Sequence, residues 1–298
     1  MTFPNLNDLV VYSGNVNNME ARVRAWLPGA DDGDWQLAGH VLGPRCDFAR
    51  TLPATISLRP TQTSSGLQSV AVVPDPCLWT PDLPMLYEVR VELRRGDEVV
   101  ATVERPLAIR MFGPRGRDLN FSGRRWVLRG VRRDTAPDAP ITAWREAGAA
   151  MLVEVLDDDL AAEAARIGIP LVVSIRETTP EGVTAELRRL ARLPAVIMAA
   201  IDATAALPDD IGVAAIDIRL AAHCQAENSP PALPRWANVL LCESEDAAAM
   251  VDAVADRDIP VIAFRPAGQL MEIAKARAAC DALQRDLAPQ ADLAGYIV

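Results

Sequence analysis

The sequence is short of lysine and of aromatic side chains, and it carries excess negative charge. Lys275 is the only lysine, aromatic residues make up 5%, and the formal net charge of the 298 residues is −10. Non-specific binding to nucleic acid draws its affinity from Lys and Arg side chains on phosphates. We therefore expect no nucleic-acid partner.

Motifs for metals, redox chemistry and cofactors are also missing. The five cysteines are an odd number without a CxxC spacing, and the two histidines, His40 and His223, lie far apart in the sequence. These features argue against a disulfide framework, a structural zinc site and a histidine-based metal site or catalytic dyad. Neither a P-loop nor a dinucleotide-binding fingerprint occurs, so we expect no cofactor and no metal.

Long apolar runs are absent as well. None reaches the ~18–20 residues that a membrane-spanning helix needs. Met1–Leu9 has neither the basic start nor the apolar centre of a signal peptide. These absences predict no membrane partner and a cytoplasmic location.

The first part of the chain contains a series of short segments that are rich in β-forming residues. Gly and Pro clusters separate them, and no amphipathic helix lies between them, which is typical of an antiparallel sandwich. We expect an immunoglobulin-like β-sandwich over residues 1–116. Its predicted strands are Leu9–Tyr12, Glu20–Trp26, Trp35–Leu42, Ala54–Leu58, Leu67–Val73, Tyr87–Arg94 and Val99–Ile109.

Residues 117–298 have a different pattern, in which apolar runs alternate with Ala-rich helical segments. Nearly continuous apolar runs suit parallel strands that are covered on both faces. A series of eight predicts a compact (β/α)8 TIM barrel, with an open doubly wound sheet as the alternative. The runs are Trp126–Val131, Met151–Leu156, Pro170–Ile175, Ala195–Ile201, Val213–Ile218, Asn238–Cys242, Pro260–Phe264 and Leu293–Val298.

Capping residues mark some of the expected helices. Asp159 is placed to begin a helix that Gly168 ends, and Gln269–Leu287 is the longest helical segment. Ser244 with Asp246 is placed to begin another. The connection from Asp202 to Asp210 is expected to lack a full helix.

Residues 76–131 carry phrases that resemble glycoside hydrolase family 2. Leu78–Tyr87 reproduces a Leu-Trp-x-Pro-x-x-Pro-x-Leu-Tyr phrase, and Phe112–Arg115 matches Phe-Gly-x-Arg. Ser122-Gly123 stands where the family has an Asn-Gly turn, and Leu128–Val131 reads Leu-Arg-Gly-Val. The resemblance implies a sandwich that leads into a glycosidase-like barrel. The jelly-roll domain that usually precedes the sandwich in this family is absent from the sequence.

The resemblance also implies two catalytic glutamates, at the ends of barrel strands four and seven. In the matching stretches, Thr204 stands at the acid/base position and Arg265 at the nucleophile position, or Phe264 with a one-residue shift. A threonine hydroxyl is no general acid near neutral pH, and neither Arg nor Phe attacks an anomeric carbon. We therefore expect a pseudoenzyme without the family mechanism.

Other polar residues are expected at the barrel mouth, where barrel catalysis takes place. They are Asp134, Glu154, Asp202, Glu243 and Arg265. Each of the four acids also has a structural interpretation: Asp134 as a surface partner of Arg132 or Arg133, Glu154 as a partner of a neighbouring arginine such as Arg129, and Asp202 and Glu243 as solvated loop acids or helix caps.

Three functions remain open. The chain could be a non-catalytic binding or scaffold module with a carbohydrate or protein partner. It could be a glycosidase that cleaves O-glycosyl bonds with a relocated pair of carboxylates. It could also be a protein–protein interaction module, including a homo-oligomer.

Overall fold

The computed structural model describes residues 4–30, 34–61, 66–224, 233–243 and 249–298, with 250 and 253 excepted. The chain divides into two compact units. One comprises residues 1–111 with 192–194, and the other comprises 112–191 with 195–298. Within the described ranges, no helix is both long and apolar enough to cross a membrane. The predicted helix that begins at Ser244 and Asp246 lies outside the described residues.

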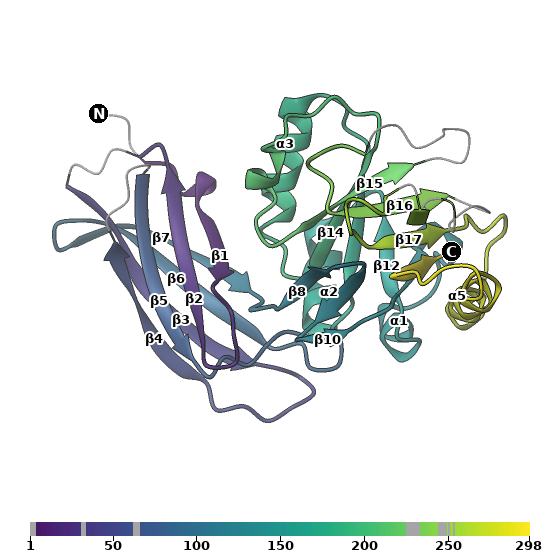
Figure 1. The fold of residues 1–298 in the computed structure, drawn as a ribbon. Helices are drawn as coiled ribbons and strands as arrows, with labels where there is room; N and C mark the ends of the chain where they lie inside the picture. The colour runs from purple at the N-terminus through teal and green to yellow at the C-terminus, as the bar shows by residue number, and fades with distance from the viewer. Residues whose placement is uncertain are drawn as a thin grey trace. The chain divides into compact units, whose positions relative to one another are not determined.

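The first unit is a single antiparallel sheet of seven strands in the order β1-β2-β5-β4-β3-β6-β7 (Figure 1). A short 3-10 helix, η1 (Leu6–Asp8), precedes it. The strands are β1 (Val10–Gly14), β2 (Glu20–Pro28), β3 (Trp35–Arg45), β4 (Ala54–Thr61), β5 (Gly66–Pro74), β6 (Leu86–Arg95) and β7 (Glu98–Leu107). All seven predicted strands are present.

Alternating burial along the strands gives this sheet one face that forms a core. In β2, Ala21, Val23, Ala25 and Leu27 are buried, whereas the residues between them are partly or fully exposed. Strand β4 pairs with β3 through its first half and with β5 through its second half, so it joins the two halves of the sheet. The buried apolar side chains of these strands form one cluster.

The second unit opens with a small three-stranded sheet. Its strands are β8 (Phe112–Arg115), β9 (Asp118–Phe121) and β10 (Arg124–Arg125). The rings of Phe112 and Phe121 lie 5.1 Å apart, and each meets the Trp126 ring edge-on. This aromatic cluster holds the sheet next to the first barrel strand.

A closed barrel of eight parallel strands makes up most of the second unit. The open-sheet alternative is therefore wrong, because β18 pairs with both β17 and β11. The strands are β11 (Leu128–Arg132), β12 (Ala150–Val153), β13 (Leu171–Ile175), β14 (Val196–Asp202), β15 (Arg219–Cys224), β16 (Val239–Glu243), β17 (Val261–Phe264) and β18 (Gly295–Ile297).

Full α-helices accompany only some of these strands in the described part of the chain. They are α1 (Ile141–Glu146), α2 (Asp158–Ile167), α3 (Pro180–Leu190) and α5 (Ile273–Leu287), with 3-10 turns at η2 (Arg133–Thr135) and η3 (Ile211–Ala214). As expected, the connection after Asp202 has no α-helix, only η3.

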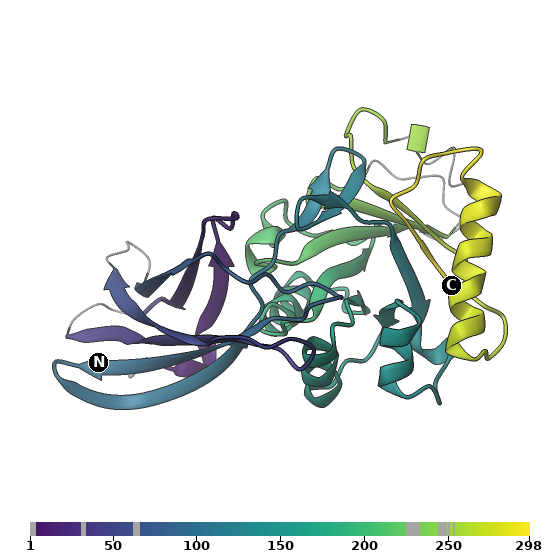
Figure 2. The same ribbon diagram turned by 90° about the horizontal axis from the view of Figure 1, so that it is seen from below.

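Helix α5 lies along the outer side of the barrel (Figure 2). It packs mainly against β11 and β18, the pair of strands that closes the barrel. The Cys280 thiol donates a hydrogen bond to the Gly130 carbonyl at 2.9 Å. The Arg129 guanidinium donates hydrogen bonds to Asp281 at 3.1 Å and to Gln284 at 2.7 Å. One helix thus covers the seam between the last strand and the first.

The fifth barrel strand is not where the apolar pattern predicts it. Val213–Ile218 forms a 3-10 turn and a bend, and the strand is Arg219–Cys224. Val213 is 68% exposed, and Asp217 has a φ of 63°, a left-handed conformation that interrupts an extended chain. The shift brings His223 to the end of a strand.

Two helix boundaries also differ. The N-cap of α2 is Asp157 rather than Asp159, because its carboxylate accepts the Leu160 N–H at 2.7 Å. Gly168 ends α2 with a φ of 84°, as predicted. Helix α5 begins at Ile273, four residues later than expected.

Candidate functional site

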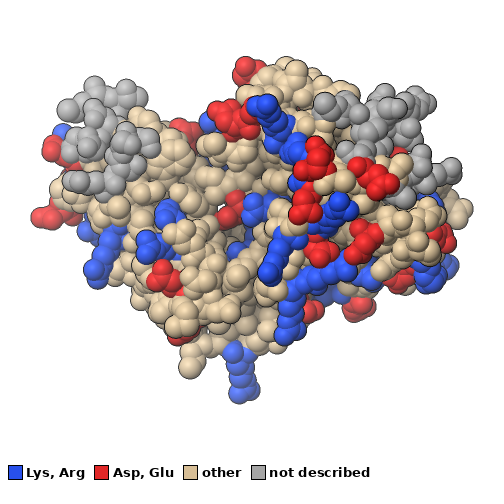
Figure 3. All heavy atoms as spheres, in the orientation of Figure 1, with Lys and Arg blue, Asp and Glu red and all other residues tan. Residues whose placement is uncertain are grey.

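A cavity of about 990 Å³ opens at the carboxyl ends of the barrel strands. Its walls come from the ends of β11 to β17 and from the segments that follow β11, β12, β13 and β14. Because parallel strands all end on the same side of a barrel, side chains distant in sequence converge there. Acidic and basic side chains are interspersed over the barrel on the face drawn in Figure 3.

At the end of each of six neighbouring strands, or in the next position along the chain, an ionisable side chain lines this cavity. Basic or imidazole groups alternate around it with carboxylates, and Phe264 of β17 follows as an apolar member. In strand order, the six are Arg132, Glu154, Arg176, Asp202, His223 and Glu243.

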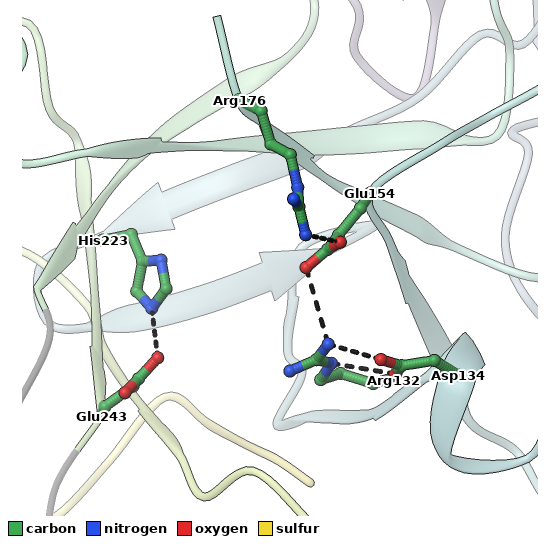
Figure 4. Close-up of polar contacts among 6 residues, drawn as sticks. All are labelled: Arg132, Asp134, Glu154, Arg176, His223 and Glu243. Atoms are coloured by element: carbon green, nitrogen blue, oxygen red, sulfur yellow. Dashed lines mark hydrogen bonds and ion pairs between the residues drawn. The ribbon is translucent and has the colours of Figure 1, made fainter. Parts of the chain in front are cut away.

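On one side of the cavity, guanidinium groups hold Glu154 between them (Figure 4). The Glu154 carboxylate pairs with Arg176, and its other oxygen lies 3.5 Å from Arg132. Arg132 also donates to Asp134 at 2.9 Å. The interpretation of Asp134 as a partner of Arg132 is confirmed. Glu154 pairs with arginines, as expected, but its partners are Arg132 and Arg176 and not Arg129.

On the other side, His223 faces a carboxylate of the next strand. Its Nε2 lies 3.3 Å from Glu243 Oε1, although the angles do not make a regular hydrogen bond. The His223 ring is also 5.8 Å from the Phe264 ring. Burial lowers the pKa of His223 below its usual 6.5, although the charges of Glu243 and Asp202 act in the opposite direction. The imidazole is therefore neutral at neutral pH.

Asp202 ends β14 and orders the residues that follow it. Its Oδ1 accepts the Thr204 hydroxyl at 2.6 Å and the Thr204 N–H at 2.7 Å. Thr204 lines the cavity, whereas Ala203 is buried and is not part of the lining. The acid/base position implied by the resemblance therefore holds a hydroxyl anchored to Asp202.

Phe264, and not Arg265, faces the cavity at the end of β17. Phe264 is 3% exposed, and the Arg132 guanidinium carbon lies 6.0 Å from the centre of its ring. Arg265 contributes no part of the lining; its guanidinium lies 3.5 Å from Asp286. Arg265 was expected among the polar residues of the barrel mouth, but it does not line the cavity.

The sequence interpretation missed His223, Arg132 and Arg176 as members of the site. His223 was missed because the fifth strand was predicted at Val213–Ile218, which does not contain it, and not at Arg219–Cys224. Arg132 and Arg176 each stand at or just beyond a strand end, so the rule that selected the acids selects them too.

In the described part of the chain, no group of three or more His, Cys, Asp and Glu side chains is arranged to hold a metal. Cys224 and Cys242 are paired in register on β15 and β16 and are buried. Burial raises the pKa of Cys242 to about 12 and also raises that of Cys224, so both thiols stay protonated.

Comparison with known proteins relates the chain to one family. Residues 10–110 match the model for "Glycosyl hydrolases family 2". No curated protein matches. The match over residues 10–110 and the similar solved structures described next both show that the chain resembles glycosyl hydrolases of family 2.

Three solved structures illustrate the likeness. A β-glucuronidase 2 of Bacteroides uniformis has 17% identity over 98% of this chain and 46% of its own, with a TM-score of 0.66. A family 2 member from Bacteroides cellulosilyticus has 14% identity, coverages of 98% and 43%, and a TM-score of 0.66. A β-glucuronidase of Bifidobacterium dentium, complexed with coumarin-3-O-glucuronide, has 13% identity, coverages of 97% and 59%, and a TM-score of 0.62. The chain spans about half the length of these proteins, and at such identities the likeness shows the fold alone.

Proposed function

We propose that the barrel mouth binds a saccharide without cleaving it by the retaining mechanism of family 2. The observation that carries this proposal is the pair of side chains at the ends of β14 and β17. Thr204 and Phe264 line the cavity where the resemblance implies the two glutamates.

The chemistry of these side chains supports the loss of that mechanism. Retention needs one carboxyl group to protonate the leaving oxygen and a second, about 5 Å away, to attack the anomeric carbon. The Thr204 hydroxyl already donates to Asp202. The Phe264 ring offers no nucleophile.

The remaining lining suits an uncharged polyol. The carboxylates and guanidinium groups around the cavity accept and donate hydrogen bonds to hydroxyls. Among the described lining residues, three arginines face five carboxylates, a formal charge of −2 with His223 neutral. An excess of negative charge disfavours an acidic sugar. We therefore propose a neutral sugar, in contrast to the glucuronide named for one of the similar structures.

Two measurements on the whole chain test this proposal. A panel of aryl glycosides should show no hydrolysis above the buffer rate, and calorimetry with methyl glycosides should detect binding of at least one neutral sugar. Methyl glucuronide should bind more weakly than methyl glucoside. Hydrolysis that disappears in Glu243→Gln would overturn the non-catalytic part, and absence of binding by any saccharide would overturn the binding part.

A relocated pair of carboxylates is the second candidate. Asp202 and Glu243 flank His223 from β14 and β16. Strands two apart in a sheet are separated by roughly 10 Å, which is close to the roughly 6.5–9.5 Å between carboxyl groups in inverting glycosidases. Turnover with inversion, lost in both Asp202→Asn and Glu243→Gln, would support it. Turnover unchanged in both variants would remove it.

A further inference from the structure

Arg105 lies on the core side of β7, an edge strand of the first unit. Along this strand, Ala101 and Val103 pack against the core cluster and Leu107 belongs to it. Arg105 continues the same row, so a guanidinium group occupies a position where the pattern places an apolar side chain. Its register partner on β6, Val89, is fully buried. The Arg105 side chain is therefore held against the edge of the core and is only partly exposed.

A second arginine lies near Arg105. Residues 192–194 follow α3 in the chain but belong to the first unit. Arg110 Nη1 fastens this segment by donating to the Pro194 carbonyl at 2.8 Å. Burial lowers the pKa of Arg105, and the positive charge of Arg192 lowers it further. Two guanidinium groups, both partly buried, thus repel each other.

Neither of these two charges is neutralised. The Nε atoms of Arg105 and Arg192 are both buried without a hydrogen-bond partner. Arg105 Nη1 donates to the Glu104 backbone carbonyl at 3.2 Å, an acceptor without formal charge. Within the described part of the chain, no carboxylate forms an ion pair with either guanidinium. A partly buried guanidinium without a counter-charge costs free energy, which a bound anion would recover.

An inward-facing arginine at the edge of a sheet also has a simpler role, which is to protect the edge from pairing with another chain. One charge is enough for that role. Arg192 comes from a distant part of the sequence and adds repulsion without adding protection. Two neighbouring guanidinium groups instead suit a phosphate group, because each offers forked N–H donors and together they match two negative charges.

We propose that Arg105 and Arg192 bind a phosphate group, either as inorganic phosphate or as a phosphate monoester. The site shares no residue with the barrel mouth, so it does not depend on the proposed saccharide site. A carboxylate offers one negative charge and two oxygens, so acetate should bind more weakly than phosphate.

Calorimetry of the whole chain at pH 8 and constant ionic strength tests the site, with inorganic phosphate as the probe. Arg105→Gln and Arg192→Gln should each weaken phosphate binding by about tenfold or more, since a hydrogen bond to a charged group contributes about this much. Arg59→Gln is the matched control, because Arg59 is an exposed arginine on β4 of the same unit, and it should leave the affinity unchanged. Glycerol phosphate distinguishes the two sources: affinity equal to that of phosphate indicates a monoester, and weaker binding indicates the free ion.

Arg192→Gln keeps the test decisive even if Arg105→Gln does not fold, because Arg192 lies outside the helices and strands. Without phosphate, Arg192→Gln should unfold at the same urea concentration as wild type or at a higher one, since a repulsion is removed. A lower midpoint would mean that a protein acid already pairs with Arg192, and the site would be abandoned.

Three results of the calorimetry would also overturn the proposal. The first is no phosphate binding by wild type, and the second is acetate binding as tightly as phosphate. The third is loss of phosphate binding in Arg176→Gln but in neither variant of the pair, because the phosphate would then lie in the barrel mouth.

Discussion

His223 lies where three strands bring charged or aromatic groups together. Asp202 is its register partner on β14, Glu243 approaches from β16 and Phe264 from β17. A neutral imidazole in this place offers a ligand one acceptor and one donor nitrogen. A protonated imidazole offers two donors, so the hydrogen-bonding character of the mouth depends on pH.

We predict that His223 titrates below its usual pKa. Burial is the largest cause of the shift. The chain has only two histidines, so NMR of histidine-labelled protein between pH 4 and 8 gives two imidazole signals, and His40→Gln assigns them. A His223 signal that titrates at 6.5 or above would contradict the prediction.

Glu243→Gln should lower the pKa of His223 further. The Glu243 carboxylate favours the imidazolium ion, and glutamine of nearly the same size removes that charge. The same NMR titration measures the shift, with Glu177→Gln, another residue of the cavity lining, as the comparison. An unchanged or raised pKa would show that the contact at 3.3 Å does not persist in solution.

The shifted pKa of His223 also predicts a pH dependence of stability. The unfolded chain takes up this proton near pH 6.5, whereas the folded chain takes it up only at lower pH. The stabilisation is therefore fully present above pH 6.5 and is lost as the pH falls through the folded-state pKa. Urea unfolding of wild type and His223→Gln should show a smaller loss in the variant across this interval. Parallel curves would exclude a contribution from His223.

The sequence predicts which residue occupies a position of the site more readily than which side chain that residue contacts. Thr204 could be placed from the order of motifs alone, because its position follows from the chain. That Glu154 meets Arg176 and Arg132, and not Arg129, depends on barrel register, which a single sequence does not specify. The contact between Arg265 and Asp286 likewise depends on packing that a single sequence does not specify.

At the scale of elements, apolar runs located seven of the eight barrel strands. The exception, Val213–Ile218, is as apolar as its neighbours, but it forms a turn: Ile218 is buried there, whereas Ile216 is only partly buried. Ile218 is 3% exposed although no strand contains it. Arg219, a charged residue, begins the true strand because its guanidinium donates to the Phe112 carbonyl at 2.9 Å. Hydrophobic pattern cannot reveal such a partner.

The cap of α2 gives a test at this scale. Asp157→Ala should destabilise the chain by about 1 kcal/mol, because the Leu160 N–H loses its acceptor. Asp159→Ala should cost less, since Asp159 lies in the first turn and acts only through the helix dipole. Urea unfolding of both variants makes the comparison. A larger cost for Asp159→Ala would restore the cap expected from the sequence.

Helix α5 should be a main support of barrel closure. Leu283 is 1% exposed on the face that packs against β11 and β18. Leu283→Ala should cost about 2–5 kcal/mol through lost burial and a cavity. Leu270→Ala, at a position 70% exposed, should cost less than about 0.5 kcal/mol. Similar costs in chemical denaturation would mean that α5 does not hold the seam.

At the scale of the whole molecule, closure of the barrel could not be derived from sequence pattern. Eight apolar runs fit an open sheet as well as a barrel, and the choice depends on whether the last strand meets the first. Here β18 pairs with β11 from Leu128 to Gly130. A Cβ at Gly295 would lie 2.6 Å from that of Leu128 and one at Gly130 would lie 2.9 Å from Ile297. Glycine at both places permits the close approach of first and last strands.

The first unit has a core and a set of strand pairings of its own. The core cluster of the first unit draws all its buried side chains from residues between Leu9 and Ile109. Each of its strands pairs with another strand of the same segment. A segment of this size with its own core is expected to fold alone.

We therefore expect a fragment of residues 1–111 to fold as an independent domain. Its circular dichroism should be that of a β protein, with one cooperative urea transition. Val91→Ala, which removes a fully buried side chain, should lower the transition midpoint, whereas Val99→Ala, at a position 45% exposed, should not. A disordered spectrum would mean that the first unit depends on the barrel, and a domain boundary near residue 111 would then have to be abandoned.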